Sequence, residues 1–452
     1  MTAEPRWARH AIFWRVYPLG FVGAFPQPAA GPAVPGEHRL RRVIGWLDHA
    51  VALGASGIAL GPIFASSTHG YDTIDHLRLD PRLGDEDDFD ELVGEAHRRG
   101  LRVQLDGVFN HVSREHPRVL AALADGAGDP SAWFRVSAGA DGQPVLETFE
   151  GHHGLVALNH ASPTVRDYVV EVLCHWLDRG ADAWRLDAAY AVPREFWAEV
   201  LPRVRAAHPG VHIEAEVIHG AYADFVAAST VDAVTQYELW KAIWSSINDR
   251  NFHELNWALS RHNQLLASFA PATFVGNHDV TRIASQIADR RHLPHAIALL
   301  ALLGGTPTIY AGDEFGMRGI KENRAGGDDA IRPEFPACPT ELPGRDMEIL
   351  RLHQLLLGLR RRHPWLHRAI SATTHLGSDH LGLRLAANGS EAPGDGGGAD
   401  ALLLDLNLSD QARDLPPGAG VLLADRATTS ALPGGHARVA PHGWAVTADA
   451  GR

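Results

Sequence analysis

The chain has 452 residues and a net charge of −13, from 41 Lys and Arg against 54 Asp and Glu. This length can hold a large core with an appended smaller domain, and the acidic balance without a basic block argues against nucleic acid or an anionic membrane as a partner. Two cysteines exclude a disulfide framework, and the 27 histidines form no tract that predicts a metal site.

The N-terminal residues 1–14 contain no long apolar segment after a basic start, and no run of 18 apolar residues occurs in the chain. We therefore expect neither a signal peptide nor a transmembrane helix. The sequence predicts a soluble cytoplasmic protein.

Short apolar runs alternate with longer amphipathic segments over most of the chain. Residues 40–54 and 86–100 show 3.6-residue spacing of apolar side chains and end at glycine, which predicts two helices. Eight strand-like runs separated by such segments predict an α/β fold, a closed parallel (β/α)8 or TIM barrel. The runs are residues 12–20, 57–61, 101–109, 183–188, 211–217, 233–237, 271–276 and 306–312.

Two segments interrupt this alternation, and both follow the C-terminal end of a strand, where such a barrel builds its active site. Residues 111–162 follow the third strand, and residues 313–344, rich in Gly, Asp and Pro, follow the eighth. From residue 372 short alternating runs predict an antiparallel β-sandwich domain, with a flexible loop at 386–400. We expect a barrel of residues 1–110 and 163–371, an inserted domain of residues 111–162 and a C-terminal β domain of residues 372–452.

Polar residues gather at the C-terminal ends of four otherwise apolar strands. Any one group could be structural, but four groups at the catalytic face of one barrel predict an active site. They are Asp106, Asn110 and His111 at the third strand, Arg185 and Asp187 at the fourth, Glu216 at the fifth, and His278 and Asp279 at the seventh.

Asp187 and Glu216 lie on adjacent strands, so their carboxyl groups could be about 5 Å apart, the separation of a retaining glycosidase. One would attack the anomeric carbon, and the other would protonate the leaving oxygen and later deprotonate water. The acid must keep its proton near neutrality, so neighbouring negative charge must raise its pKa. Arg185, on the same face of the strand as Asp187, is expected to keep that carboxylate ionised. The structural alternative is a buried ion pair that only fixes the strand, and such pairs stabilise weakly.

The same motifs resemble those of a known family. DGVFNH, WRLDAAY, EAEV and FVGNHD, in this order and spacing, resemble the four signature regions of the α-amylase superfamily, glycoside hydrolase family 13. The segments GPIF, HGYDTIDH, LN at 158–159 and GGTPTIYAGDEFG match its members as well. The resemblance covers about residues 10–365. It implies that residues 111–162 are the family's domain B and that the C-terminal β region is its domain C.

The resemblance implies a role for each matching residue. Asp187 would be the nucleophile, Glu216 the general acid/base, and Asp279 the third carboxylate, which binds sugar hydroxyls and helps to stabilise the oxocarbenium-like transition state. The other implied positions are Arg185, His111 and His278 lining subsite −1, Tyr71 stacking on its sugar or only packing a loop, Asp106 supporting the site from behind, and Asp328 with Arg332 gripping the sugar of subsite −1 or −2. Asp329 could replace Asp328, and a solvated salt bridge is the structural alternative for the Asp328–Arg332 pair.

The segments HGYDTIDHLRLDPRLGD and FEGHHGLVALN resemble the neopullulanase, cyclomaltodextrinase and maltogenic amylase branch. Members usually carry an extra N-terminal β domain that packs in their dimers. We expect this chain to lack that domain, which leaves a homo-oligomer open. His152 and His153 stand where many members have two tryptophans, and EAEVIH departs from the branch after the acid/base. The resemblance therefore implies a substrate that is not a standard one, such as a short or cyclic maltose-built oligosaccharide.

We expect a retaining α-glucosidic hydrolase that acts on short or cyclic maltooligosaccharides, including cyclic maltosyl-maltose. A transglycosylase of the same family is the first alternative, and Trp240 or the residues after Glu216 would favour it if they lined subsite +1. The structural alternative for Trp240 is packing in the core with Trp244. A non-catalytic carbohydrate-binding or transporter-associated relative is remote, because all three carboxylates are present. Asn110 matches a calcium-site position of the family, but its domain B partners cannot be placed. We therefore predict no cofactor and no metal.

Overall fold

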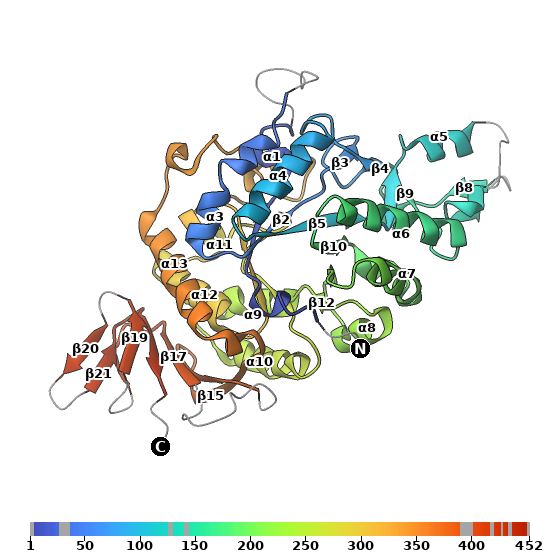
Figure 1. The fold of residues 1–452 in the computed structure, drawn as a ribbon. Coiled ribbons are helices and arrows are strands. Elements are labelled where there is room, and N and C mark those ends of the chain that lie inside the picture. The colour runs from blue at the N-terminus through green and yellow to red at the C-terminus, as the bar shows by residue number, and fades with distance from the viewer. Residues whose placement is uncertain are drawn as a thin grey trace.

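The computed structural model describes residues 4–26, 37–124, 130–139, 144–388, 401–415, 420–425, 428–432 and 436–449. Its centre is a parallel barrel of eight strands that follow one another around the sheet in chain order (Figure 1). The first strand pairs with the second and with the last, and a bridge between Thr235 and Ala272 closes the remaining gap. The strands are β1 (Phe13–Val16), β2 (Gly57–Leu60), β5 (Arg102–Val108), β10 (Ala183–Asp187), β11 (His212–Ala215), β12 (Ala233–Val234), β13 (Ala272–Thr273) and β14 (Thr306–Tyr310).

Each of the eight predicted runs contains one barrel strand, so the predicted (β/α)8 fold is confirmed. The strands are nearly continuous apolar runs because helices cover their outer face while side chains fill the barrel. The covering helices are α2 (Arg41–Ile44), α3 (Leu47–Leu53), α4 (Glu86–Arg98), α6 (Pro163–Asp178), α7 (Arg194–Ala207), α8 (Tyr222–Ser229), α9 (Tyr237–Asn248), α10 (His253–Leu266), α12 (Leu293–Leu302) and α13 (Met347–Arg362), with the short α1 (Pro18–Phe21) and α11 (Ile283–Gln286).

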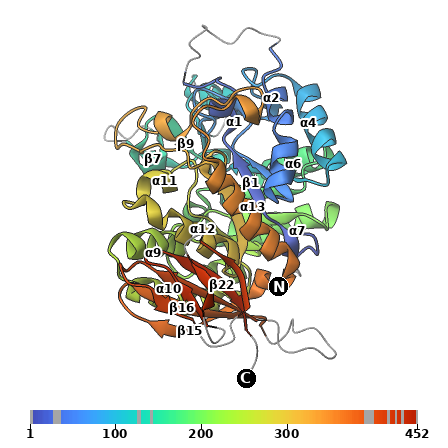
Figure 2. The ribbon, with the colours of Figure 1, turned by 90° about the vertical axis from the view of Figure 1, so that its left-hand side faces the viewer.

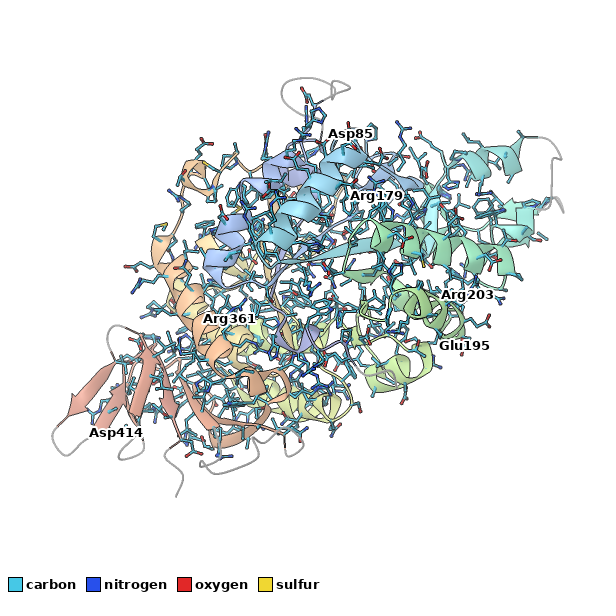
Figure 3. All side chains as sticks on the ribbon, viewed as in Figure 1. Asp85, Arg179, Glu195, Arg203, Arg361 and Asp414 are labelled. Carbon is cyan, nitrogen blue, oxygen red and sulfur yellow. The ribbon has the colours of Figure 1, made fainter. Side chains whose placement is uncertain are left out.

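The two predicted helices behave differently. The helix predicted over 86–100 is α4, and Asp85, labelled in Figure 3, directly precedes it. The helix begins at a capping box in which Asp85 and Asp88 accept hydrogen bonds from each other's backbone N–H. The single helix predicted over 40–54 is wrong, because the chain forms α2 and then α3. Between them Trp46 is buried in the core, and its indole N–H donates to the carbonyl of Pro336 at 2.9 Å.

The segment between β5 and α6 forms a small unit beside the barrel, at the right of Figure 1. In it β6 (His111–Ser113) pairs antiparallel with β9 (Leu155–Ala157), and β7 (Val136–Ala138) pairs with β8 (Pro144–Leu146). The helix α5 (Pro117–Leu123) lies between β6 and β7 in the chain. A separate hairpin of β3 (Phe64–Ser66) and β4 (Thr73–Leu79) follows β2. Both units are on loops that leave the C-terminal ends of barrel strands.

Two antiparallel sheets form the C-terminal part, on the side of the barrel away from the inserted unit (Figures 1 and 2). The predicted loop at 386–400 falls mostly on residues 389–400, outside the described residues. A small core of Leu415, Ala437, Val439 and Ala445 joins the two sheets. The larger sheet contains β15 (Ile370–Leu376), β16 (His380–Ala386), β17 (Ala401–Asn407), β22 (Trp444–Ala448) and β19 (Gly420–Ala424), and the smaller contains β18 (Arg413–Asp414), β21 (His436–Val439) and β20 (Thr429–Leu432).

Among the helices in the described ranges, none has the length and apolarity that a membrane span requires.

The guanidinium of Arg360 holds α13 to the segment that enters β14. Arg360 is buried, and its Nη1 donates to the carbonyls of Ala301 and Leu303 at 2.9 and 2.8 Å. Its Nη2 donates to the carbonyl of Gly305 at 2.5 Å. The last carbonyls of a helix such as α12 have no intrahelical partner, so this one side chain satisfies acceptors that would otherwise be buried alone.

We expect Arg360→Met to lower the free energy of unfolding by about 3 kcal/mol, because it leaves several buried carbonyls without a donor. Arg351→Gln is the matched control, since Arg351 lies on the same helix but is exposed. The control should change stability by less than about 0.5 kcal/mol. Chemical denaturation measures both, and equal midpoints for the two variants would contradict this role of Arg360.

Candidate active site

The fold places Asp187 and Glu216 side by side. Asp187 is the last residue of β10, and Leu186 before it pairs with Ala215 at the end of β11. The next residue, Glu216, donates its backbone N–H to the carbonyl of Leu186 at 2.9 Å. Neighbouring strands are about 4.8 Å apart, so the two carboxyl groups occupy adjacent positions at the C-terminal end of the barrel.

Arg185 connects three carboxylates through one guanidinium. Its Nη1 lies 2.6 and 2.8 Å from the two oxygens of Asp106 and 3.3 Å from Oδ1 of Asp187, while its Nη2 lies 2.6 Å from Oε1 of Glu216. The Arg185 side chain is only 3% exposed. Asp106 lies on β5 directly across from Arg185. The predicted pairing of Arg185 with Asp187 is present, but the contact with Glu216 is shorter.

Glu216 has more hydrogen-bond donors than Asp187. Its Oε2 accepts from the backbone N–H of Ala188 at 2.9 Å, and its Oε1 accepts from the hydroxyl of Tyr237 at 3.2 Å. The amide of Asn277 in turn donates to the Tyr237 hydroxyl at 3.0 Å. These donors hold the Glu216 carboxyl in a fixed position.

The two neighbouring carboxyls hold a proton more tightly than exposed ones do. Burial raises the pKa of Glu216, against the pull of Arg185. Burial and the negative charge of Glu216 raise the pKa of Asp187, which Arg185 again opposes. Because each charge disfavours the other, the pair titrates as a unit and keeps one proton to a higher pH than a free carboxyl would.

The third carboxylate, Asp279, lies across the site next to His278. The ring of His278 stacks on Tyr71 with centroids 5.5 Å apart, and the Tyr71 hydroxyl donates to Oδ2 of Asp106 at 3.2 Å and hydrogen-bonds Nε2 of His278. The same nitrogen lies 3.1 Å from Asp279. Burial opposes the charge on Asp279, but His278 and Arg332 outweigh it and lower the pKa of Asp279 below its ordinary value.

Arg332 joins Asp279 to Asp328. Its Nη2 lies 2.9 Å from both carboxylates, and its Nε donates to the carbonyl of His278 at 2.8 Å. Asp328, and not Asp329, is therefore the residue that pairs with Arg332. Arg332 is buried, so the pair is not a solvated surface salt bridge.

His111 lies at the edge of the site, where the inserted unit begins. Its Nε2 is 2.9 Å from the carbonyl of Tyr71, and its ring stacks on Phe149 of the short 3-10 helix η3 (Phe149–Gly151). The side-chain amide of Asn110 hydrogen-bonds Nδ1 of His111 at 3.2 Å. In the described ranges, no grouping of three His, Cys, Asp or Glu ligands includes a residue of the inserted unit.

Three contributors to the site are absent from the sequence prediction. They are Tyr237 and Asn277, which support Glu216, and Tyr17, whose ring stacks on His278 at 6.1 Å. Tyr17 and Tyr237 lie inside predicted strand runs, and Asn277 directly follows one. The rule that selected the other residues, polar groups at the C-terminal ends of apolar runs, could have found all three.

A cavity of about 640 Å³ lies beside Glu216. Tyr190, which lines it, donates its backbone N–H to the carbonyl of Glu216 at 3.2 Å and its hydroxyl to Oε1 of Glu150 at 3.1 Å. Val217 and His219 line the cavity from the loop after β11. Trp240 is not among its lining residues, and its indole donates to the carbonyl of Val275 at 3.2 Å.

The chain was compared with known families, curated proteins and solved structures. The family profile described as "Alpha amylase, catalytic domain" matches residues 36–351. A cyclomaltodextrinase of a Bacillus species is 30% identical over 385 residues, covering 79% of this chain and 67% of that protein. The intracellular maltogenic amylase of Bacillus subtilis strain 168 is 28% identical over 382 residues, covering 79% of this chain and 63% of that protein.

Solved structures of other proteins are also similar to this chain in fold. The cyclic alpha-maltosyl-(1→6)-maltose hydrolase of Arthrobacter globiformis, in complex with its named sugar, is similar with a TM-score of 0.79 at 25% identity, covering 99% of this chain and 100% of that chain. The family profile spans most of the chain and includes the barrel strands from β2 to β14. This chain therefore belongs to the alpha-amylase family of glycoside hydrolases.

Proposed function

We propose that this chain is a retaining α-glucosidic hydrolase of short or cyclic maltooligosaccharides that works through a covalent glycosyl-enzyme. The observation that carries this proposal is the arrangement of Asp187 and Glu216 on adjacent strand ends, in contact with the single guanidinium of Arg185. Carboxyl groups on adjacent strand ends can lie about 5 to 5.5 Å apart, the separation that double displacement at an anomeric carbon requires.

In the first step a carboxylate oxygen of Asp187 forms a bond to the anomeric carbon while the glycosidic C–O bond breaks. The leaving oxygen takes the proton held by Glu216. In the second step Glu216, now ionised, removes a proton from water, whose oxygen attacks the anomeric carbon and releases Asp187. Before the first step and after the second, Asp187 is ionised and Glu216 is neutral. Between the steps, Asp187 is a neutral ester and Glu216 is ionised. The pair therefore carries one negative charge throughout, and Arg185 balances it.

The remaining site residues would hold the sugar of subsite −1. Asp279 is 30% exposed, so its carboxylate can accept hydrogen bonds from sugar hydroxyls, and Arg332 keeps it ionised. His111 and His278 would donate to hydroxyls as the ring distorts, and Tyr71 would offer an aromatic face to the sugar. Asp328 would contact the sugar at the far end of this subsite.

The cavity beside Glu216 would take the part of the substrate that leaves with the protonated oxygen, since Tyr190 and Val217, next to the proposed acid, line it. The names of the similar proteins, a cyclomaltodextrinase and a cyclic maltosyl-maltose hydrolase, favour cyclic α-glucans. Product analysis with linear maltooligosaccharides, cyclodextrins and a cyclic α-1,4/1,6 tetrasaccharide tests this choice; turnover of the linear chains alone would contradict it.

The cytoplasm is the proposed place of action, supported by a relative named as intracellular.

Transfer to a sugar acceptor is the second candidate activity, since it shares the first chemical step. Ile218, which follows the acid/base by two residues, is 40% exposed and offers an apolar contact to an acceptor sugar. Products longer than the substrate would favour this second activity.

Asp187→Asn should lower kcat/KM on the best substrate by about 10,000-fold, because the amide cannot attack the anomeric carbon. Asp178→Asn, at the exposed end of α6, is the matched control and should leave the rate unchanged. Steady-state kinetics on the substrate panel measure both variants. Retained glycosidic activity in Asp187→Asn would rule out the proposed nucleophile.

Glu216→Gln should lower turnover of oligosaccharides by about 100- to 10,000-fold, the usual contribution of a general acid. It should spare the first step with a glycosyl fluoride, whose leaving group needs no proton. Pre-steady-state release of fluoride measures that step directly. An equal loss on both kinds of substrate would contradict the assignment of Glu216 as the acid.

The dependence of kcat/KM on pH should be bell-shaped. Activity rises with pH as Asp187 loses its proton and falls as Glu216 loses the remaining one. Because burial raises the pKa of Glu216, the falling limb lies above about pH 4.3, where an exposed glutamate titrates. In Glu216→Gln with the fluoride the falling limb should vanish, whereas a rising limb should stay, because Asp187 must still lose its proton before it can attack. A falling limb that persists in this variant would contradict the assignment.

A further inference from the structure

A second group of polar side chains lies away from the active site, where the barrel meets the C-terminal sheets. Asp289 precedes the 3-10 helix η5 (Arg290–His292), which leads into α12, and His442 lies in the turn before β22. Figures 1 and 2 both place α12 beside these sheets. One ligand atom each from Asp289, His292 and His442 lie within 4.8 Å of one another, although 150 residues separate the two histidines.

The hydrogen bonds around His442 resemble those of a metal ligand. Its Nε2 lies 2.7 Å from Oδ1 of Asp410, and because an ionised carboxylate only accepts, Nε2 carries the proton. Its Nδ1 therefore presents a lone pair, 3.0 Å from Nε2 of His292. A carboxylate that holds the outer nitrogen of an imidazole and turns the inner one to a common centre is the usual support of metal-binding histidines.

The backbone at His442 is also unusual. Its φ is +57°, in the left-handed region that non-glycine residues seldom adopt. Such conformations persist where the surrounding structure holds them, and they cluster at ligand-binding positions. Here the left-handed turn carries the imidazole to the buried ring of His292.

We propose that Asp289, His292 and His442 bind a divalent transition-metal ion of the zinc type, with Asp410 orienting His442. Two neutral imidazoles and one carboxylate suit zinc and similar ions, whereas calcium and magnesium prefer oxygen ligands alone. Water would complete the tetrahedron. The ion would tie the start of α12 to the turn before β22, and so the barrel to the C-terminal sheets.

Two contacts compete with the ion. The Nε2 of His292 and the Nδ1 of His442 hydrogen-bond each other at 3.0 Å, and an ion bound to both would replace that bond. Arg291 contacts both carboxylate oxygens of Asp289, at 2.6 to 3.1 Å, but its side chain is 60% exposed and can move into solvent. Among the described residues, one other group of three ligands, His38 with Asp85 and Asp88, has the required spacing. That group has a different explanation, because both aspartates form the capping box of α4.

The test uses the full chain after treatment with a chelator, titrated with Co²⁺ and with Zn²⁺ separately. We expect one Co²⁺ per chain with the visible absorption of a tetrahedral site, displacement of Co²⁺ by Zn²⁺, and a rise of the unfolding midpoint with Zn²⁺ concentration. His442→Asn is the decisive variant, because asparagine tolerates the left-handed backbone while the imidazole is lost. It should weaken binding at least about 100-fold.

Two further variants separate ligand loss from misfolding. Asp289→Asn keeps a capping side chain for η5 and removes the charged ligand, and Asp410→Asn should weaken binding by about 10- to 100-fold. His253→Asn, at an exposed histidine on α10, is the control and should bind as the parent does. Binding that is equally tight in the parent and in His442→Asn, or absent from the parent at millimolar Co²⁺, would overturn the proposal.

Discussion

The side chain of Arg185 contacts three carboxyl groups at the C-terminal end of the barrel, and the geometry of the site depends on it. Without that guanidinium, Asp106, Asp187 and Glu216 would repel one another in a buried space, where uncompensated charge is costly. With it, the two reacting carboxyls stand next to each other and keep one proton between them. The barrel strands set these positions, since β10 and β11 end with Asp187 and Glu216 at neighbouring positions, while β5 places Asp106 opposite Arg185, two residues deeper in the barrel.

Further hydrogen bonds and ion pairs position Glu216 on one side of Arg185 and Asp279 on the other. Tyr237 and the backbone N–H of Ala188 hydrogen-bond Glu216, so the proposed general acid/base has little freedom to turn away. On the opposite side Arg332 keeps Asp279 ionised and joins it to Asp328. In the proposed mechanism Glu216 moves a proton, and Asp279 keeps a negative charge toward the sugar. This division follows from which carboxylates are buried together and which are paired with an arginine.

The sequence is a good guide where one local rule applies. Barrel strands are short apolar runs, and a polar side chain at their C-terminal ends faces the active site, so the residue pattern is enough to pick out Asp187 and Glu216. The rule does not say which carboxyl has more donors. The hydrogen bonds to Glu216 come from the backbone N–H of Ala188, directly after β10, and from Tyr237, the first residue of α9. Those contacts depend on the register of strands and not on composition.

Other features depend on packing between distant segments, which local patterns do not encode. The break between α2 and α3 at Trp46 follows from the indole's place in the core. The approach of His292 to His442 needs α12 and the turn before β22 to pack together, and in the sequence these histidines look scattered. Asp328 and Asp329 are neighbours in the chain, and only their geometry selects Asp328 as the partner of Arg332.

The most direct test of the central claim is to trap the covalent intermediate. A fluorinated α-glucosyl fluoride forms the ester quickly and hydrolyses slowly, so mass spectrometry of the intact chain and of its peptides can locate the attached sugar. The account predicts one sugar per chain, on the peptide that contains Asp187, and none after Asp187→Asn. A sugar attached to Glu216, or turnover of the reagent without any attached sugar, would contradict it.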